Sequence, residues 1–468
     1  MTTGDICFTP ATELARIIRD GQVSSREVVQ AVLDRIERLN PLMNAYCTVV
    51  AEQALDEAIT ADAAIARSAE TGPLHGVPVS IKDLVATKGI RTTRGSPLFA
   101  DWVPDFDAPL VERLRAAGAV ILGKTNTPEF GHLAVTRNSI FGATANPWNL
   151  EYTPGGSSGG AVAAVASGLG PLAEGSDGGG SIRIPASFTG VYGLKPSLGR
   201  VPLYPMDQGM EMLSVSGPIT RTVADAALML DVMAGPDDRD INSLPAAPGT
   251  FLEAASAAGV EKLRIAYSPA LGHADVDSEI AAIVERATRV FADLGCVVEE
   301  IDFAIDSPAD DYLLISSSMY AAVRQDDREE VRTRIDPGYM DLVDEVWDAS
   351  AADFVRASGL RRDLCRRFGE LMTRYDLLLT PTMPVPARPI TDPGLRSQNL
   401  GWNPFCPAFN MTGQPAASVP CGFTASGLPV GLQIVGRRFD EYTVLRASAA
   451  FEAAAPWAGA RPPAPFGA

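Results

Sequence analysis

Three short segments carry polar side chains whose types and settings could support catalysis. Lys82 follows the apolar run Val-Pro-Val-Ser-Ile, Ser157 lies within Pro-Gly-Gly-Ser-Ser-Gly-Gly, and Ser181 follows three glycines in a row. A lysine after an apolar strand is often a charge that points into water. A lysine drawn into the interior loses its charge more readily, because burial disfavours the ammonium form, and it can then act as a general base.

The segment that runs from Glu174 to Arg183 allows two interpretations. Its three glycines leave backbone N–H groups uncovered just before a helix that could begin near Ile182. Such N–H groups can stabilise the negative oxygen that forms when a carbonyl is attacked. The alternative is a tight strand-to-helix turn in which Ser181 caps the helix. The segment alone leaves both interpretations open.

The glycine-rich segment around Ser157 also allows more than one interpretation. A flexible linker fits poorly, because a small-residue helix over about residues 161–167 follows at once. A phosphate-binding loop would require the ending Gly-Lys-Ser/Thr, which this segment lacks. Four glycines around two serines do permit unusual backbone geometry and the close approach of other groups.

Histidine is scarce, and this bears on the choice of base. The chain has only His75, His132 and His273. A Ser-His-Asp triad would need one of them. His75 lies near Lys82 in the sequence, but its setting, Pro-Leu-His-Gly-Val-Pro, indicates a turn and a structural role. The scarcity of histidine therefore argues against a Ser-His-Asp triad.

The hydrophobic periodicity predicts the elements that would position these residues. Helices are expected first, and from about Val77 strands and helices alternate, which is typical of an α/β fold with a mixed or mostly parallel sheet. We predict one large domain over residues 1–468, with a mixed β-sheet covered by helices on both faces. Its expected parts are N-terminal helices (1–70), a catalytic core (71–306), a variable helical lid or substrate region (307–376), and C-terminal core strands with a last helix (377–456).

One helix boundary is predicted in detail. Ser24-Ser-Arg-Glu27 is a capping box, in which the serine and glutamate side chains satisfy free backbone N–H groups at the start of a helix. Asn40-Pro41 is expected to end the same helix, because proline lacks an N–H and its ring clashes with the preceding turn.

The composition argues against several classes of partner. A net charge of −18 makes nucleic acid or an anionic membrane an unsuitable partner, since both attract basic surfaces. No apolar stretch approaches the roughly 20 residues that span a bilayer, and the first residues lack the pattern of a signal peptide. The six cysteines are scattered without a CxxC pair, as expected for reduced thiols in a cytoplasmic protein.

Taken together, the three segments resemble the amidase signature family. The signature runs through Gly-Gly-Ser-Ser-Gly-Gly160, Asp-x-Gly-Gly-Ser-Ile-Arg183, Pro-Ala-Ser-Phe-Thr-Gly190 and Gly-Leu-Lys-Pro196, and all of these are present in this order. The spacing between Lys82 and the two serines also suits the family. The resemblance extends from the first helices to Gln433 and is weak only in the charged insertion.

The resemblance implies a serine hydrolase of amide-type bonds that needs no metal or organic cofactor. Ser181 would be the nucleophile, Ser157 a bridge that passes the proton, and Lys82 a neutral base. The family's bridging serine follows a cis peptide bond, so a cis Gly156–Ser157 bond is expected here. Four backbone N–H groups would form the oxyanion hole (Gly178, Gly179, Gly180 and Ser181), and three residues would support the site (Ser158, Asp177 and Arg183).

The resemblance leaves the substrate open. The signature resembles the branch that includes nylon-oligomer hydrolases and broad aryl acylamidases, and urethane hydrolases also occur in the family. We expect a broad amidase for small-molecule hydrophobic or aryl amides, with carbamate (urethane) hydrolysis and a side activity on esters as the alternative. The expected pocket residues are aromatic, although they could equally pack the lid (Tyr320, Tyr339, Trp347, Trp402 and Phe405).

Two other functions would also suit the resemblance, a component of an amidotransferase and a non-catalytic binding module. The amidase-type component of a glutamine amidotransferase, which works in a complex on charged tRNA, resembles this chain in its triad. The chain lacks that branch's Tyr-Asp-Gly-x-Arg-Tyr-Gly segment and has Met-Tyr-Ala-Ala-Val323 in the comparable stretch. A non-catalytic binding module on the same fold would have no need of the intact lysine and serines.

We expect a monomer or a homodimer.

Overall fold

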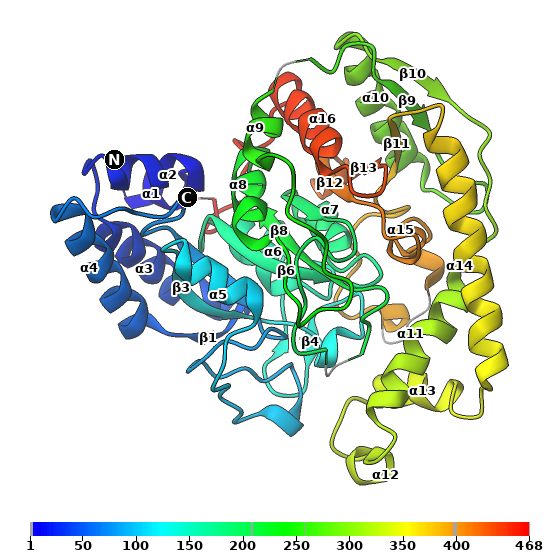
Figure 1. Cartoon of the computed structure of the whole chain (residues 1–468), viewed down its shortest axis with the longest axis horizontal. Coiled ribbons are helices and arrows are strands. Elements are labelled where there is room, and N and C mark those ends of the chain that lie inside the picture. Colours follow the sequence, from blue (N-terminus) through cyan, green and yellow to red (C-terminus); the bar gives the residue numbers. More distant parts are fainter. Residues whose placement is uncertain (1–2, 207–208, 258, 396–399, 468) are drawn as a thin grey trace.

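The computed structural model describes residues 3–206, 209–257, 259–395 and 400–467. Its main sheet has 11 strands in the order β1-β3-β2-β6-β8-β7-β12-β13-β11-β9-β10, and β4 pairs separately with β5 (Figure 1). The strands are β1 (Tyr46–Val49), β2 (Pro78–Lys82), β3 (Val120–Thr125), β4 (Arg137–Asn138), β5 (Gly142–Ala143), β6 (Leu172–Asp177), β7 (Tyr192–Lys195), β8 (Val215–Thr220), β9 (Arg264–Tyr267), β10 (Val297–Glu300), β11 (Leu377–Pro381), β12 (Ala416–Phe423) and β13 (Pro429–Gly436).

The main sheet is mixed, which confirms the prediction. Strand β2 pairs in parallel with both β3 and β6, whereas β6 pairs with β8 in antiparallel orientation. At the other end of the sheet, β9 pairs in parallel with β10 and β11. The parallel pairing of β2 and β6 matters for the site, because it brings the carboxyl ends of both strands to the same edge.

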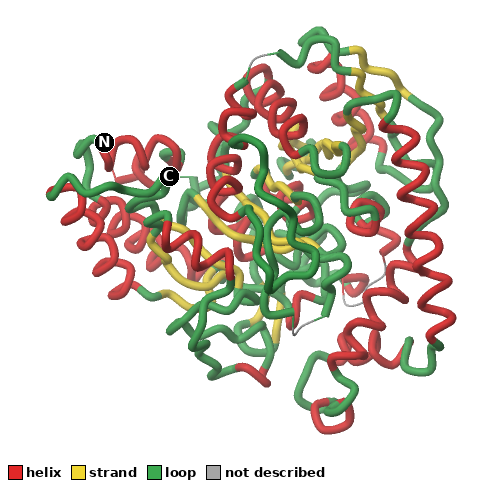
Figure 2. Tube along the Cα trace, viewed as in Figure 1, coloured by secondary structure: helices red, strands yellow, loops and turns green. Residues whose placement is uncertain are grey.

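Helices also form a large share of the described chain (Figure 2). They are α1 (Thr3–Phe8), α2 (Ala11–Arg19), α3 (Ser25–Met43), α4 (Ala51–Ala66), α5 (Pro109–Ala116), α6 (Gly159–Ala166), α7 (Arg183–Thr189), α8 (Val223–Met233), α9 (Phe251–Ser256), α10 (Ser278–Asp293), α11 (Ala309–Val323), α12 (Arg328–Val331), α13 (Pro337–Glu345), α14 (Ala351–Met372), α15 (Pro407–Met411) and α16 (Glu441–Ala454). Short 3₁₀ turns are η1 (Pro97–Phe99), η2 (Glu129–Gly131), η3 (Pro393–Leu395) and η4 (Leu400–Trp402).

Helices cover both faces of the sheet, as predicted. Side chains alternate between the two faces of a strand. Leu377 and Leu379 of β11 therefore enter the large core cluster that contains residues of α8, α10 and α16. Leu378, between them, enters a second cluster with residues of α11, α14 and α15. The α/β fold with a sheet between two helical layers is thus confirmed.

One predicted boundary is wrong. Helix α3 does not end at Asn40-Pro41 but continues to Met43, with Pro41 inside its last turn. The capping box of Ser24 and Glu27 forms at its start, as predicted. The last turn tolerates proline because Leu39 and Met43 are both buried in a core cluster, and this burial outweighs the loss of one backbone hydrogen bond.

The charged segment 307–376 forms four helices, α11 to α14, and α14 runs along the outside of the molecule (Figure 1). Ion pairs on its surface include Arg332 with Asp344 and Arg366 with Glu370.

Through the described residues, no helix combines the length and the apolar character that crossing a membrane requires.

Candidate active site

Lys82 is the last residue of β2, and the sheet brings it to the two glycine-rich segments. Its Nζ lies 2.7 Å from Ser157 Oγ and 2.9 Å from Ser158 Oγ. A third hydroxyl, that of Ser176 at the end of β6, also lies 2.9 Å from Nζ. The structure therefore places the predicted lysine and both neighbouring serines in one hydrogen-bonded group. Ser176 was not predicted from the sequence, and its place on the strand next to β2 is what brings it there.

Lys82 has no solvent exposure, and this controls its charge. Burial lowers the pKa of Lys82 to about 7, although the negative charges of Glu174 and Asp177 act in the opposite direction. Burial likewise raises the pKa of Glu174, whose carboxylate accepts a hydrogen bond from the Lys82 backbone N–H at 3.1 Å. Both shifts favour the neutral forms, so the amine is able to accept a proton near neutral pH.

The Ser157 segment is shaped by close backbone approach. The Gly156–Ser157 peptide bond is cis, as predicted. A side chain on Gly156 would begin 2.6 Å from the backbone of Val135, so only glycine fits there. Thr136 Oγ1 accepts a hydrogen bond from the Gly159 N–H and donates one to the Gly155 carbonyl, which ties the two ends of the segment together.

Ser181 lies beside this segment. The N–H of Ser158 donates to the Ser181 carbonyl at 3.1 Å, and Ser157 and Ser181 line the same cavity. Across the described residues, no hydrogen bond joins the hydroxyls of Ser157 and Ser181. Ser181 does not cap helix α7, which begins at Arg183 with Ile182 in the cap position. The interpretation of Ser181 as a helix cap is therefore wrong.

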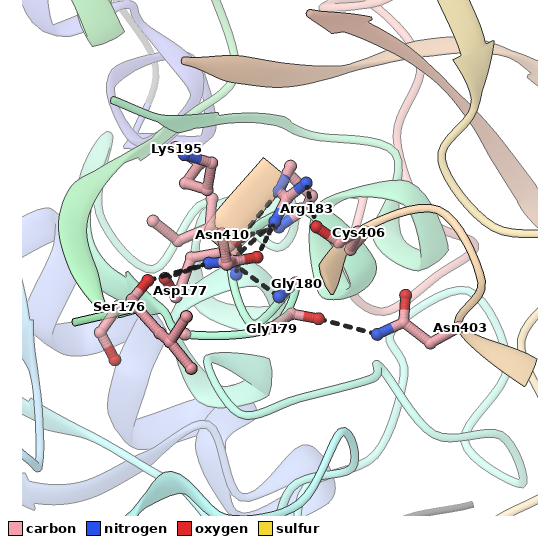
Figure 3. Close-up of polar contacts among 12 residues, drawn as sticks. Ser176, Asp177, Gly179, Gly180, Arg183, Lys195, Asn403, Cys406 and Asn410 are labelled. Atoms are coloured by element: carbon pink, nitrogen blue, oxygen red, sulfur yellow. Dashed lines mark hydrogen bonds and ion pairs between the residues drawn. The ribbon is translucent and has the colours of Figure 1, made fainter. Parts of the chain in front are cut away.

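The Asp177 carboxylate organises the loop that carries Ser181 (Figure 3). It accepts hydrogen bonds from the backbone N–H groups of Gly180 (2.7 Å) and Ile182 (3.2 Å). Arg183 donates to it through Nε and through a terminal nitrogen, both at 2.9 Å. Burial opposes the charged carboxylate, but the charge and hydrogen bonds of Arg183 outweigh it and hold the pKa of Asp177 below its usual value.

Asn410 of α15 completes this buried network, although the sequence did not single it out. Its Nδ2 donates to Asp177 Oδ1 at 2.9 Å, and its Oδ1 accepts from Arg183 at 2.6 Å (Figure 3). Gln433 of β13 also accepts from Arg183, at 2.7 Å. These partners lie more than two hundred residues along the chain from Asp177, and no local pattern in the sequence signals the contact.

The structure corrects one predicted oxyanion donor. The N–H of Gly180 donates to Asp177 Oδ1, so this group is already engaged. Within the described ranges, the N–H groups of Gly178, Gly179 and Ser181 have no acceptor in the protein. The carboxylate of Asp177 is close enough to take the Gly180 N–H because the loop turns at Gly180, whose φ is +122°.

A cavity of about 140 Å³ opens in front of the serines. Its walls are mainly apolar, and none of the described residues that line it has an Asp, Glu, Lys or Arg side chain. The apolar wall residues include Leu84, Leu110, Leu133, Ile184, Leu203 and Met210. Polar wall residues beyond the predicted set include Ser176, Tyr312 and Asn403.

Of the five aromatic residues predicted for the pocket, Tyr320 lines the cavity. The structure does not bring the other four to its wall. Tyr339 packs between Phe130 and Tyr320, with ring centroids 5.1 Å apart in each case. Trp347 lies under the guanidinium of Arg328 near the surface, Trp402 stacks on Phe188, and Phe405 is fully buried in the core. Large apolar rings fill the interior of the helical layer, which the sequence does not distinguish from a pocket wall.

None of the histidines takes part in the serine network. His75 contacts the carbonyl of Ala61 through Nε2 at 3.0 Å, which agrees with a structural role. His132 lines the cavity, but its Nδ1 lies 2.7 Å from the Glu129 carbonyl and its Nε2 lies 3.6 Å from Asp336. Lys82 is thus the basic group that contacts Ser157.

Comparison with known proteins identifies relatives over nearly the whole chain. An acylamidase from Rhodococcus erythropolis is 40% identical over 484 residues, which cover 99% of this chain and 98% of that protein. A glutamyl-tRNA(Gln) amidotransferase subunit from Moorella thermoacetica is also 40% identical, over 490 residues that cover 98% of this chain and 99% of that protein.

Solved structures show the same likeness. A bacterial aryl acylamidase of the amidase signature family superposes with a TM-score of 0.89 at 34% identity, covering 96% of this chain and 97% of that one. A 6-aminohexanoate cyclic dimer hydrolase superposes with a TM-score of 0.89 at 32% identity, covering 97% and 99%. The family model described as Amidase matches residues 27–445. The resemblance found in the sequence is therefore confirmed, and this chain belongs to the amidase family, among the amidase signature enzymes.

Proposed function

We propose that this amidase hydrolyses amides of hydrophobic or aryl groups through an acyl-enzyme formed on Ser181. The observation that carries the proposal is the position of the buried Lys82 amine, whose Nζ lies 2.7 Å from Ser157 Oγ. Ser157 in turn lines the same cavity as Ser181. A lysine held without solvent contact and among hydroxyls is suited to accept a proton, whereas a lysine that served only as a surface charge would not be buried.

The proposed reaction begins with proton transfer. Neutral Lys82 accepts a proton from Ser157 as Ser157 accepts one from Ser181, and the Ser181 oxygen attacks the substrate carbonyl. The resulting tetrahedral intermediate collapses when the C–N bond breaks and the proton held by Lys82 returns to the leaving nitrogen. Water then attacks the acyl-enzyme, with its proton taken up by the same relay, and releases the carboxylic acid.

The oxyanion of the intermediate needs donors, and the proposal uses the backbone for them. The N–H groups of Gly178, Gly179 and Ser181 remain available, since no described residue of the protein accepts them. Donors that are fixed before the reaction stabilise developing charge at no cost of reorganisation, and each such donor contributes about 10²–10³ in rate.

The cavity wall supports a neutral, apolar substrate. Leucine, methionine and isoleucine side chains line it, and none of its described wall residues is an Asp, Glu, Lys or Arg that would pair with an ammonium or carboxylate group. The 40% identity to a component of an amidotransferase makes glutamine the second candidate substrate. Free glutamine carries both an ammonium and a carboxylate, so a wall whose described residues include no Asp, Glu, Lys or Arg favours the apolar amide over it.

Carbamates are the alternative within the same mechanism. A carbamate also presents a carbonyl with a nitrogen leaving group, and an ester presents a carbonyl with a better leaving group. A panel of anilides, primary amides, carbamates and esters, scored by kcat/KM, distinguishes these classes. Hydrolysis of glutamine only in the presence of partner proteins would contradict the proposal and favour the amidotransferase.

The nucleophile is tested directly by Ser181→Ala. This variant should show no hydrolysis of an apolar p-nitroanilide and no labelling by a fluorophosphonate probe. The control is Ser256→Ala, since Ser256 is exposed at the end of α9. Retained activity in a folded Ser181→Ala variant would overturn the proposal, and an unlabelled wild-type enzyme would favour a non-catalytic binding module.

A further inference from the structure

Two carbonyl groups of the glycine loop are held from outside the loop. The hydroxyl of Tyr312, on α11, donates to the Gly178 carbonyl at 3.0 Å. Nδ2 of Asn403 donates to the Gly179 carbonyl at 2.7 Å (Figure 3). Both donors come from segments far along the chain from the loop, and both residues line the cavity.

These contacts determine where the loop's N–H groups point. In a trans peptide unit, the C=O and the N–H of the next residue lie on opposite sides. Among the described residues, neither the Gly178–Gly179 bond nor the Gly179–Gly180 bond is cis, so both are trans. Holding the Gly178 carbonyl therefore orients the Gly179 N–H away from Tyr312, and holding the Gly179 carbonyl orients the Gly180 N–H.

The two N–H groups differ in what they contact. That of Gly180 already donates to Asp177 Oδ1, so Asn403 holds a peptide unit that is fixed at both ends. That of Gly179 has no acceptor among the described residues. The hydroxyl of Tyr312 is accordingly the one side-chain contact, within the described chain, that holds the peptide unit carrying the free Gly179 N–H.

We propose that Tyr312 is a positioning residue for the oxyanion hole and that helix α11 is thereby part of the catalytic apparatus. This inference rests on the proposed function, because it concerns the donors of that reaction. Tyr312 does not touch the reacting atoms. It acts through the Gly178–Gly179 peptide unit, which has glycine on both sides and hence little conformational restraint of its own.

The packing around Tyr312 supports a fixed position. The side chain is 5% exposed and belongs to the core cluster that contains Ile315, Leu213 and Phe405. A β-carbon on Gly179 would lie 2.2 Å from the Tyr312 hydroxyl oxygen, so the hydroxyl rests directly on this glycine. Burial raises the pKa of Tyr312 well above its usual value, which keeps the hydroxyl protonated and able to donate.

The inference is tested by Tyr312→Phe, which removes the donor and keeps the ring. We expect kcat for an apolar anilide to fall about tenfold, less than the loss of a whole donor, because the N–H remains but is no longer held. KM should stay within about twofold. The affinity of a trifluoromethyl ketone, which forms a tetrahedral adduct with the serine, should weaken in parallel with kcat, whereas a carboxylate product should bind as before.

The matched control is Tyr192→Phe. Tyr192 is also fully buried, and its hydroxyl makes one hydrogen bond, to Ser448 at 3.3 Å, away from the cavity. This variant should keep kcat, KM and inhibitor affinity. Fluorophosphonate titration counts the competent sites in each preparation, so kcat is expressed per labelled serine even where part of a variant is unfolded.

Each outcome has one meaning. An unchanged kcat per site in Tyr312→Phe, or equal loss of ketone and product affinity, would overturn the positioning role. Such a result would leave the proposed function intact as long as Ser181→Ala is inactive. Activity retained in Ser181→Ala would instead overturn the proposed function itself. The comparison variant Asn403→Ala should reduce kcat less than Tyr312→Phe, because Asp177 still holds the Gly180 N–H.

Discussion

The loop around Ser181 and the helical segment α11–α14 are held in opposite ways. Asp177 and Arg183, which hold the loop, have side chains with 0% exposure. Arg366 and Glu370 on α14 pair at 2.8 Å, but their side chains are 58% and 65% exposed. The loop is thus fixed by a few buried polar contacts, while ion pairs such as Arg366–Glu370 on the outer helices are exposed to water.

This difference matters for what each region can do. A buried ion pair leaves an uncompensated charge when one partner is removed, so its loss is severe. An exposed pair is replaced by water at little cost. Rigid geometry is needed where charge develops in a reaction, and the buried network supplies it at the loop. The exposed ion pairs of the outer helices are therefore free to vary, whereas the contact of α11 with the loop through Tyr312 is not.

Next to the loss of all activity in Ser181→Ala, the largest effect is expected from Lys82→Met, which removes the base and keeps an unbranched apolar side chain in the buried site. Without the amine, Ser157 has no acceptor for its proton, and kcat/KM should fall by about 10²–10⁴ or more. Steady-state kinetics with an apolar anilide measures this. Lys88→Met, at an exposed lysine six positions along the chain, is the control and should leave kcat/KM unchanged. A loss of less than tenfold in folded Lys82→Met would exclude Lys82 as the base.

Asp177→Asn tests how much the buried ion pair with Arg183 contributes to stability. The substitution leaves the Arg183 charge without its partner at a site that has no exposure, so the free energy of unfolding should fall by about 3–5 kcal/mol. Urea denaturation followed by circular dichroism measures the change. Stability equal to that of the wild type would show that the loop is not held by this pair.

The pH dependence tests the charge of Lys82. Its pKa is lowered by burial to about 7, and the base must be neutral to accept a proton. Protonation below this pH removes the active form, so kcat/KM should fall about tenfold for each unit of pH well below 7 and reach a plateau above it. A flat profile from about pH 5 to 9, with a substrate that does not ionise, would contradict a lysine base.

The smallest effect is expected for the exposed ion pairs of the outer helices. Asp344 pairs with Arg328 and Arg332, and its side chain is 36% exposed. Asp344→Asn should shift the urea midpoint much less than Asp177→Asn does, and high salt should remove the difference from wild type. A loss as large as that of Asp177→Asn would show that the helical segment is also held by its ion pairs.

The fold class was predictable because its signals are local. Alternating strands and helices, the capping box at Ser24 and the order of the glycine-rich segments are all properties of neighbouring residues. The end of α3 was not predictable in this way. Pro41 signals a helix end, and only the burial of Leu39 and Met43 against other parts of the chain outweighs that signal.

The pocket was the least predictable part of the site. Phe405 and Tyr339 are aromatic residues of the kind that often line a pocket, but both are buried in the interior, where Tyr339 packs against Phe130. The apolar residues that do line the cavity, such as Leu133 and Leu203, have nothing in their local sequence that distinguishes them from core residues.

The sequence by itself determined the family, the mixed α/β fold and the identity of the lysine and serines that meet at the site. Glycine context and spacing carry that information, because few sequences place these residue types in this order. Only the tertiary structure decided which N–H groups of the loop stay free and which residues hold them. Gly180 is engaged by Asp177, and Gly178 is held by Tyr312, since these contacts join residues that the chain separates and the sheet and helices bring together.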